Sequence, residues 1–193
     1  LSRQYYSFDY QNVHFVAMSV ETLYGVGSKQ FDFVKSDLQK AASNQNVDWI
    51  VVFNHDLAYS SPSNSTKSLI KLRGAYHPLF EKYGVDLVLQ AHNHNYQRSY
   101  PILFNPINSS SPIISDLNAS NYDDPDGQIF TTVGTGGVNQ FHEFVGKSPY
   151  TVTQFKGYGF LNLAVANNGT TLVGEFLDNR GGVRDHFSIS KSH

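Results

Sequence analysis

Two short apolar runs, each followed closely by histidine, constrain the fold of this chain more than any other feature. Residues 48–53 lead into His55, and residues 85–89 lead into His92 and His94. Apolar runs of this length are typical of buried strands. A buried strand that ends in His-x-His suits a metal site, because neutral imidazole is a common ligand for zinc, iron and manganese. For an isolated His-x-His, two solvated loop histidines are the alternative.

An amphipathic stretch between the two runs predicts a helix over residues 66–83. Proline removes a backbone donor, so we expect Pro78 to bend or restart this helix. A strand, a helix and a second strand form a right-handed crossover between parallel neighbours. The histidines would then share the carboxyl edge of the sheet, where ligands bind in open α/β folds. We therefore expect His55, His92 and His94 to converge.

Two longer segments make the pattern specific. Residues 79–89 read Leu-Phe-Glu-Lys-Tyr-Gly-Val-Asp-Leu-Val-Leu, and residues 91–99 read Ala-His-Asn-His-Asn-Tyr-Gln-Arg-Ser. His55 precedes His92 by 37 residues (92 − 55). Together these features resemble the calcineurin-like metallophosphoesterases, and among them the purple acid phosphatase branch. The segment Tyr-Tyr-Ser-Phe-Asp-Tyr at residues 5–10 extends the resemblance toward the start of the chain.

The resemblance implies a role for each of the three histidines. His55 and His92 would ligate one metal of a dinuclear centre, and His94 would ligate the other. Ala91 stands where the family usually has glycine. A histidine pair that plant enzymes carry after the first ligand is also missing, since Asn64 and Ser65 lie at about that place.

Four further side chains or loops are expected beside the metals or the substrate. Tyr59, Tyr96 and Gly136 would form the wall of the site, Gly136 as part of the glycine loop 134–137, and His142 would lie on the substrate side. Arg98 is expected to brace its loop by hydrogen bonds. Three other histidines, His14, His77 and His186, are expected to be structural or surface residues.

The other elements are predicted from periodicity and turn residues. A helix is expected over 28–43 with Ser28 as its N-cap, and an irregular excursion over 103–127. The Asn-Gly pair at 168–169 favours a hairpin. The expected strands are 5–9, 12–18, 128–133, 158–166, 170–178 and 182–190, the last three antiparallel.

These elements predict an α/β fold that forms part of a four-layer α/β/β/α sandwich with mixed sheets and a C-terminal antiparallel meander. Residues 1–193 would be the carboxyl-terminal half of a metallophosphoesterase domain. The family's first half carries Asp-x-His, Gly-Asp and Gly-Asn-His-Asp/Glu segments, and none of them occurs before His55. Two nearby divalent ions repel each other strongly, so the loss of a bridging carboxylate matters physically.

Composition excludes several classes of function. The formal net charge is −2 and the sequence has no Lys/Arg-rich run, which argues against a nucleic-acid-binding protein. No apolar stretch reaches membrane-spanning length. There is no cysteine, and the chain starts at Leu1 without a signal-peptide pattern, as if cut from something longer. Extracellular or secretory localisation is favoured weakly by four glycosylation sequons, at Asn64, Asn108, Asn118 and Asn168.

The predicted function is metal-dependent hydrolysis of a phosphoric ester of a small molecule, a monoester first and a diester as the alternative. The complete enzyme would hold two ions of iron, zinc or manganese, and this chain alone one or none. Its partner would be the missing amino-terminal half of the fold, so the isolated chain is expected to be weak or inactive. The alternatives are a non-catalytic domain that binds a single metal and a surface-binding β-rich module.

Overall fold

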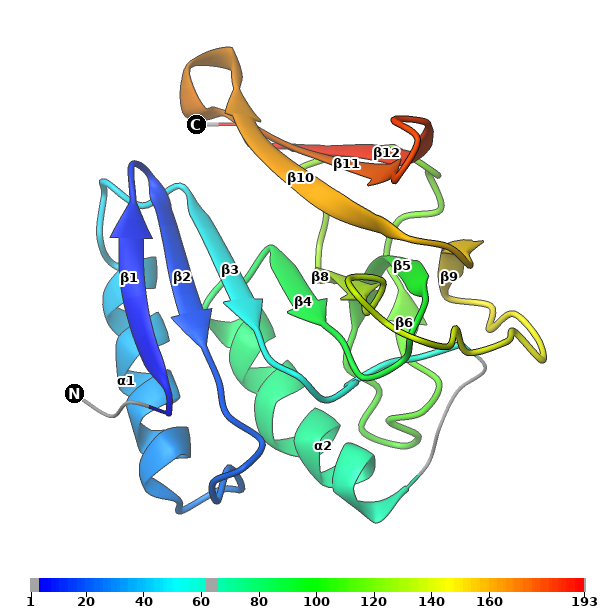
Figure 1. The fold of residues 1–193 in the computed structure, drawn as a ribbon. Helices are drawn as coiled ribbons and strands as arrows, with labels where there is room; N and C mark the ends of the chain where they lie inside the picture. The colour runs from blue at the N-terminus through cyan, green and yellow to red at the C-terminus, as the bar shows by residue number, and fades with distance from the viewer. Residues whose placement is uncertain (1–3, 62–65, 193) are drawn as a thin grey trace.

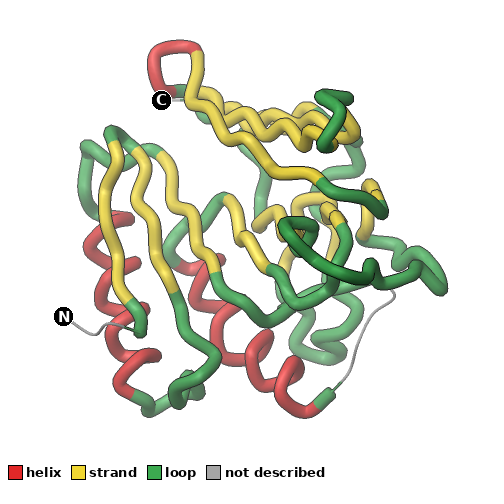
Figure 2. Tube along the Cα trace, in the orientation of Figure 1, coloured by secondary structure: helices red, strands yellow, loops and turns green. Residues whose placement is uncertain are grey.

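The computed structural model describes residues 4–61 and 66–192, which form two stacked β-sheets with both helices on the outer face of the larger sheet (Figures 1 and 2). The larger sheet consists of β1 (Tyr6–Tyr10), β2 (Val13–Ala17), β3 (Trp49–Phe53), β4 (Leu87–Gln90), β5 (Tyr96–Leu103), β6 (Ile113–Ile114), β8 (Gln128–Val133) and β9 (Thr151–Phe155). The smaller sheet consists of β7 (Asn121–Asp123), β10 (Gly159–Ala166), β11 (Thr171–Asp178) and β12 (Val183–Ser190). The helices are α1 (Lys29–Ala42) and α2 (Lys67–Lys82), with one short 3-10 turn, Asn167–Gly169.

The larger sheet is mixed, in the order β1-β2-β3-β4-β8-β5-β6, with β9 added against β5. Strands β2, β3, β4 and β8 run parallel, and Val52 of β3 lies opposite Val88 of β4. This confirms the predicted parallel pair that flanks α2. The smaller sheet has the order β10-β11-β12-β7, and its three long strands are antiparallel as predicted.

Both helices begin and continue for identifiable reasons. The Ser28 side chain accepts a hydrogen bond from the Phe31 N–H at 3.1 Å, which confirms the predicted N-cap of α1. Helix α2 continues through Pro78 instead of restarting there. An internal proline costs about 3 kcal/mol, but apolar residues on both sides of it, such as Tyr76 and Phe80, are buried against the sheet and offset that cost.

Alternation along the strands divides the apolar residues into two cores. In β3, Ile50 and Val52 pack toward the helices, whereas Trp49 and Val51 pack between the two sheets. Central parallel strands are buried on both faces, which explains why residues 49–53 read as a continuous apolar run.

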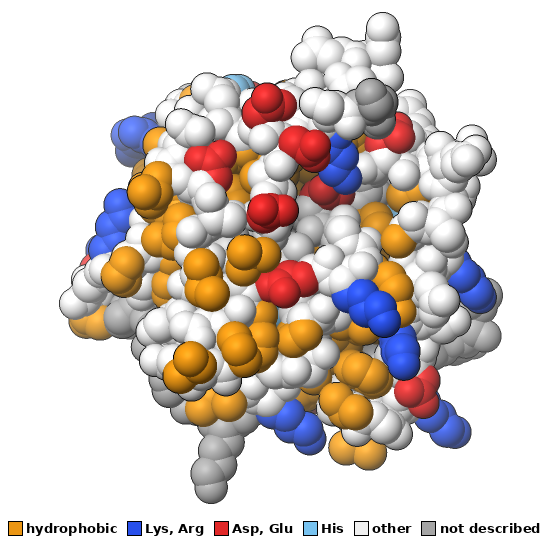
Figure 3. Space-filling view, turned by 180° about the vertical axis from the view of Figure 1, so that it is seen from behind, with side chains coloured by type: hydrophobic (Ala, Val, Ile, Leu, Met, Phe, Trp, Pro, Cys, Tyr) orange, Lys and Arg blue, Asp and Glu red, His pale blue; other side chains and the backbone are white. Residues whose placement is uncertain are grey.

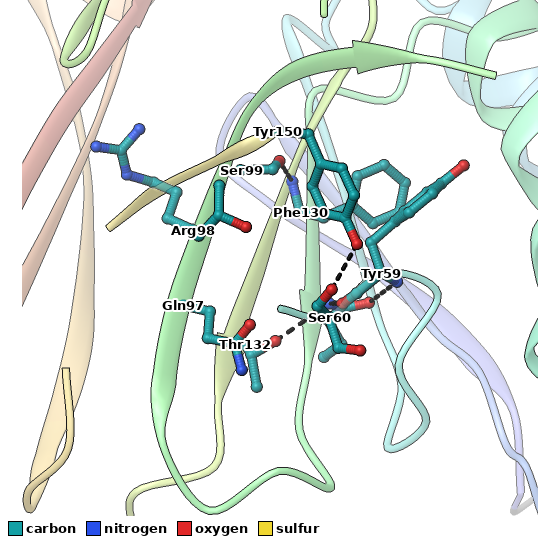
Figure 4. Close-up of a pocket in the computed structure, with 10 residues that line it drawn as sticks. Tyr59, Ser60, Gln97, Arg98, Ser99, Phe130, Thr132 and Tyr150 are labelled. Atoms are coloured by element: carbon teal, nitrogen blue, oxygen red, sulfur yellow. Dashed lines mark hydrogen bonds between the residues drawn. The ribbon is translucent and has the colours of Figure 1, made fainter. Parts of the chain in front are cut away.

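Arg98 connects the two sheets. Its Nε donates to Asp185 of β12 at 2.6 Å, and Nη1 donates to the Tyr122 hydroxyl of β7 at 2.8 Å. The Arg98 side chain is almost fully buried, and Figure 4 shows it pointing away from the neighbouring polar residues of β5. Arg98 therefore has a structural role through its hydrogen bonds, as expected, but these bonds connect the two sheets instead of stabilising its own loop.

The sequence missed several elements. Strand β5 was not predicted, and neither was β9. The excursion over 103–127 contains the short strands β6 and β7. In the described residues the layers are helices, larger sheet and smaller sheet, and no helix of this part covers the outer face of the smaller sheet (Figure 1).

Candidate metal centre

His55 and His92 lie side by side at the carboxyl edge of the larger sheet. Each follows the last residue of its strand, β3 or β4, by two positions. Their ring centres are 5.5 Å apart and the rings are nearly perpendicular. The Ala91 N–H donates to the His55 carbonyl at 3.1 Å, which ties the two loops together. Ring centres at this separation are compatible with two imidazoles that share one ion, for which metal–nitrogen bonds are about 2.0–2.1 Å long.

His92 has an unusual backbone conformation. Its φ is +59°, and the Asn93 N–H donates to the Ala91 carbonyl at 2.6 Å, so His92 is the centre of a γ-turn of the rare positive-φ kind. Such a conformation costs on the order of 1–3 kcal/mol and is found most often at functional sites. Ala91 itself has no positive φ, so alanine fits at the position where the resemblance leads us to expect glycine.

His94 faces a different neighbour. Its ring stacks on that of His142 at 4.5 Å, and the Gln140 carbonyl accepts from His94 Nδ1 at 2.8 Å. The backbones also pair, because the His142 N–H donates to the His94 carbonyl at 3.2 Å. A carbonyl oxygen can only accept, so the proton of His94 lies on Nδ1 and the lone pair of Nε2 is left for a ligand. This is the usual support for a metal-binding histidine.

The glycine loop lies directly against the His-x-His segment. The Gly134 N–H donates to the Asn95 carbonyl at 3.1 Å, and a Cβ at Gly134 would lie 2.0 Å from the Asn93 carbonyl oxygen. Only glycine permits this approach. Gly136 is exposed, and a Cβ there would meet nothing within 4 Å. The loop therefore supports the histidine turn through Gly134, while the expected place of Gly136 in the wall of the site stays a prediction.

Two buried glutamines hold the loop that follows His55. The Gln90 Oε1 accepts from the Ala58 N–H at 2.8 Å, and its Nε2 donates to the Tyr59 carbonyl. The Gln97 Oε1 accepts from the Ser61 N–H at 2.6 Å. These contacts surround an internal cavity of about 10 Å³, which is room for about one water molecule. The glutamines therefore fix the chain behind His55.

The two expected wall tyrosines are core residues. The Tyr59 hydroxyl contacts His77 Nδ1 at 2.6 Å, and burial raises the pKa of Tyr59 well above its usual range. The Tyr96 hydroxyl donates to Asp185 at 2.7 Å between the sheets. His77 is buried too, and burial lowers its pKa to about 4, so it is a neutral core residue. Burial and these partners leave neither tyrosine hydroxyl to a ligand.

Few side chains that could ligate a metal ion lie close together in the described residues. Across residues 4–61 and 66–192, no three His, Cys, Asp or Glu side chains are close enough together to hold a metal ion. The structure therefore brings together His55 and His92, and it places His94 with His142 rather than in a cluster with them. Two imidazoles fit part of one ion's coordination sphere, and a dinuclear centre would need carboxylates from elsewhere.

Sequence reasoning missed the residues that hold the site. Gln90 was hidden at the end of an apolar run, and Gln97 lies inside the motif segment. Gln140 contributes only its carbonyl oxygen, so its side chain gave no signal. The one available signal was the polar alternation in β4 and β5, since a glutamine in a buried strand needs hydrogen-bond partners.

On the face opposite to that of Figure 1, acidic side chains gather in the upper part and basic ones are scattered (Figure 3). Among the described residues, no helix is both long and apolar enough to cross a membrane.

Comparison with known proteins identifies similar chains, although no family model matches. Mouse "Acid phosphatase type 7" is 28% identical over 197 residues, which are 92% of this chain and 44% of that protein. "Fe(3+)-Zn(2+) purple acid phosphatase 12" of Arabidopsis thaliana is 30% identical over 143 residues, which cover 72% of this chain and 29% of that protein. "Probable inactive purple acid phosphatase 1" of the same plant is 27% identical over 199 residues, which cover 100% of this chain and 31% of that protein.

A solved structure shows the same architecture. The purple acid phosphatase PPD1 from yellow lupin seeds superposes with a TM-score of 0.82 at 25% identity, covering 98% of this chain and 33% of that one. This chain thus spans less than half the length of each of these proteins. One of the relatives is named as inactive, so similarity alone does not establish catalysis.

Proposed function

We propose that this chain, whose fold is that of a calcineurin-like metallophosphoesterase of the purple acid phosphatase branch, supplies part of the metal site of a metal-dependent phosphoric ester hydrolase. The observation that carries the proposal is the His55–His92 pair, 5.5 Å apart at the ends of two neighbouring parallel strands. The orientation of His94 adds to it, because its proton is held on Nδ1 by a carbonyl oxygen.

The ligands are divided between two positions in this proposal. His55 and His92 hold one ion, and His94 holds the second, supported by Gln140 and His142. When bound at these positions, ions of iron, zinc or manganese would supply positive charge that offsets the charge of the phosphoryl oxygens and would lower the pKa of a coordinated water. The protein's own residues hold and orient: the γ-turn at His92 and the close approach of Gly134 set the direction of the histidines. The substrate class is a small phosphomonoester, as the relatives' names suggest.

The remaining ligands come from outside residues 1–193 in this proposal. A two-metal centre needs anionic groups between the ions, and the described residues offer no acidic side chain in a cluster with the histidines. The chain then acts as the carboxyl-terminal half of a metallophosphoesterase domain, with a second polypeptide segment that brings carboxylates. Secretory localisation fits the exposure of Asn108, Asn118 and Asn168 in their sequons, while Asn64 lies outside the described residues.

Metal content and hydrolysis test this function together. The 193-residue chain is combined with a polypeptide that carries the Asp-bearing half, and bound iron, zinc and manganese are measured by elemental analysis. We expect about two ions per complex and hydrolysis of p-nitrophenyl phosphate. His92→Ala or His94→Ala should abolish both. His186→Ala is the matched control, because His186 is exposed on β12, far along the chain from the site.

Two results would contradict the proposal. One is full metal binding and activity in the His92→Ala variant. The other is binding of a single ion without any hydrolysis in the complex, which would favour the non-catalytic, single-metal alternative that the name of the inactive relative leaves open.

A further inference from the structure

An open hollow of about 450 Å³ lies at the end of the two sheets opposite to His55 and His92. Its walls come from the turn between β1 and β2, from Asp48 just before β3, and from the turn between β10 and β11. Strands β2 and β3 begin beside this hollow, whereas His55 follows the far end of β3. The hollow is therefore separate from the candidate metal centre, and the proposed function does not use it.

Polar side chains form most of the wall of the hollow. Gln11, Asn12 and Asp48 line it from the larger sheet, and Asn167 and Asn168 line it from the smaller sheet. Amide groups donate and accept hydrogen bonds, and a carboxylate accepts them. The end of β10 adds a small apolar part. A wall of this kind suits a ligand that carries several hydroxyl groups on a compact ring, as a sugar does.

Hydrogen bonds hold the walls in a fixed position relative to each other. The Asn12 Nδ2 donates to Asp48 Oδ2 at 2.7 Å and to the Gly169 carbonyl oxygen at 3.4 Å. The Trp49 Nε1 donates to the same carbonyl oxygen at 2.7 Å. These bonds attach the turn of the smaller sheet to the larger sheet. A ligand therefore meets a preformed site, so little ordering of the protein opposes its binding.

The turn between β10 and β11 presents Asn168 at the hollow. Asn167 and Asn168 have φ values of +51° and +57°, a left-handed conformation in which asparagine is enriched. Asn168 is exposed, and the turn projects from the end of the smaller sheet (Figure 2). Residues 168–170, Asn-Gly-Thr, form a glycosylation sequon. A side chain that is exposed and also lines the hollow can hold a covalently attached sugar there.

The sequon at Asn108 has a different environment. The Asn108 Nδ2 donates to the Ser111 hydroxyl at 3.2 Å, so this amide group is already used inside its own turn. The Ser110 hydroxyl accepts a hydrogen bond from the buried Arg73 at 2.9 Å. The sequon at Asn118 is exposed within the excursion over 103–127. Asn168 is the sequon asparagine that lines the hollow.

We propose that Asn168 carries an N-linked glycan and that the first sugar of this glycan, an N-acetylglucosamine, occupies the hollow. In the modification, the Asn168 Nδ2 loses one proton and forms a bond to the anomeric carbon of the sugar. The bond from that carbon to the pyrophosphate of a lipid-linked oligosaccharide donor breaks, and the lipid pyrophosphate leaves. The sugar then bonds to Gln11 and Asp48, so it connects the two sheets and stabilises their packing. This inference rests on the secretory localisation in the proposed function, but not on metal binding or hydrolysis.

Secretion of the whole protein from a eukaryotic cell line tests the modification. The secreted protein is treated with a glycosidase that converts a glycosylated asparagine into aspartate, and mass spectrometry of its peptides locates each converted residue. We expect conversion at Asn168 in most molecules. A secreted protein in which Asn168 is unmodified would overturn the inference.

Thermal unfolding tests the place of the sugar. An endoglycosidase first trims every glycan to its first sugar. Asn168→Asp should then lower the melting temperature by about 2–4 °C, the shift expected when one or two hydrogen bonds are lost in a chain of this size. Aspartate also tolerates the left-handed conformation, and the same substitution in protein made in bacteria, without glycans, should cause no shift. Asn118→Asp is the matched control in the secreted protein. A glycan at Asn168 whose loss leaves the melting temperature unchanged would contradict its place in the hollow.

A second substitution examines the wall itself. Gln11→Ala should lower the melting temperature of the glycosylated protein by a similar shift, but it should have no effect in the Asn168→Asp background, because both changes remove the same contact. Gln39→Ala, at an exposed position on α1, is the control. Equal effects of Gln11→Ala in the two backgrounds would show that the sugar lies elsewhere.

The glycan and the proposed function can fail separately. A stabilising glycan at Asn168 in a protein that binds no metal and hydrolyses nothing supports this inference and contradicts the phosphatase proposal. Metal-dependent hydrolysis by a secreted protein whose Asn168 is unmodified has the opposite meaning.

Discussion

Protonation of His14 should control part of the stability of the fold. His14 Nδ1 lies 2.6 Å from Asp9 of β1, and Nε2 lies 2.9 Å from Asp37 of α1. Both carboxylates accept, so both contacts are satisfied only when the ring carries two protons. Burial opposes that charge, but the hydrogen bonds that His14 donates to Asp37 and Asp9 outweigh it, and the pKa of His14 is raised above 6.5.

The magnitude follows from the two contacts. A hydrogen bond between charged groups contributes about 1.5–3 kcal/mol, but Asp9 is mostly exposed and its bond is discounted. We therefore expect about 1–2 kcal/mol in total. Because the pKa in the folded state is raised, this stabilisation is fully present below pH 6.5 and is lost as the pH rises through the folded-state pKa.

Urea unfolding followed by the fluorescence of Trp49 measures the effect. The free energy of unfolding is determined for the natural chain and for His14→Gln between pH 5 and pH 9. The difference in unfolding free energy between the two chains should be about 1–2 kcal/mol near pH 5 and should shrink toward pH 9, because His14 loses its proton over this range. Other titrating groups affect both chains alike and cancel in the difference. His186→Gln serves as the control. A difference that stays constant across the pH range would refute the assignment of a charged, bridging His14.

Two further predictions concern the site and the opposite end of the sheet. Gly134→Ala should weaken metal binding by the assembled protein more than tenfold, since its Cβ would meet the Asn93 carbonyl oxygen at 2.0 Å, while Gly136→Ala should be neutral; elemental analysis distinguishes them. Lys191→Met should cost about 3–5 kcal/mol at pH 8, because Lys191 lies 2.7 Å from the buried Asp86. Burial raises the pKa of Asp86 to about 6, so the loss should be smaller at pH 5, where the carboxyl is protonated, and urea unfolding at both pH values tests this. Lys156→Met, which removes an exposed ion pair with Glu143, should change stability by less than about 0.5 kcal/mol.

Strands that are buried on both faces could be predicted from the sequence, whereas a strand with buried polar side chains could not. Residues 49–53 and 87–90 stood out because burial on both faces demands a continuous apolar run. Strand β5 carries Gln97, Arg98 and Ser99, which are buried only because hydrogen bonds from distant segments satisfy them. Those partners lie tens of residues away along the chain, so local periodicity could not identify them.

At the carboxyl edge of the larger sheet, the geometry of an extended chain does not predict where His92 and His94 lie. Residues two apart in a strand point the same way, which led us to expect His92 and His94 to converge with His55. The chain instead forms a γ-turn at His92, and a second bond of the same span joins the Asn95 N–H to the Asn93 carbonyl at 2.8 Å. Two successive tight turns separate the side chains, so His92 pairs with His55 and His94 stacks on His142.

This division has a chemical consequence. Three imidazoles that converged would make one neutral site, whereas the observed pair and the separate, carbonyl-oriented His94 offer donors at two positions. Two positions suit two ions, and two ions need anionic ligands to offset their repulsion. The turn at His92 thus supports the proposed assignment of His92 and His94 to different ions, and that assignment requires the carboxylates that we propose to come from a second segment.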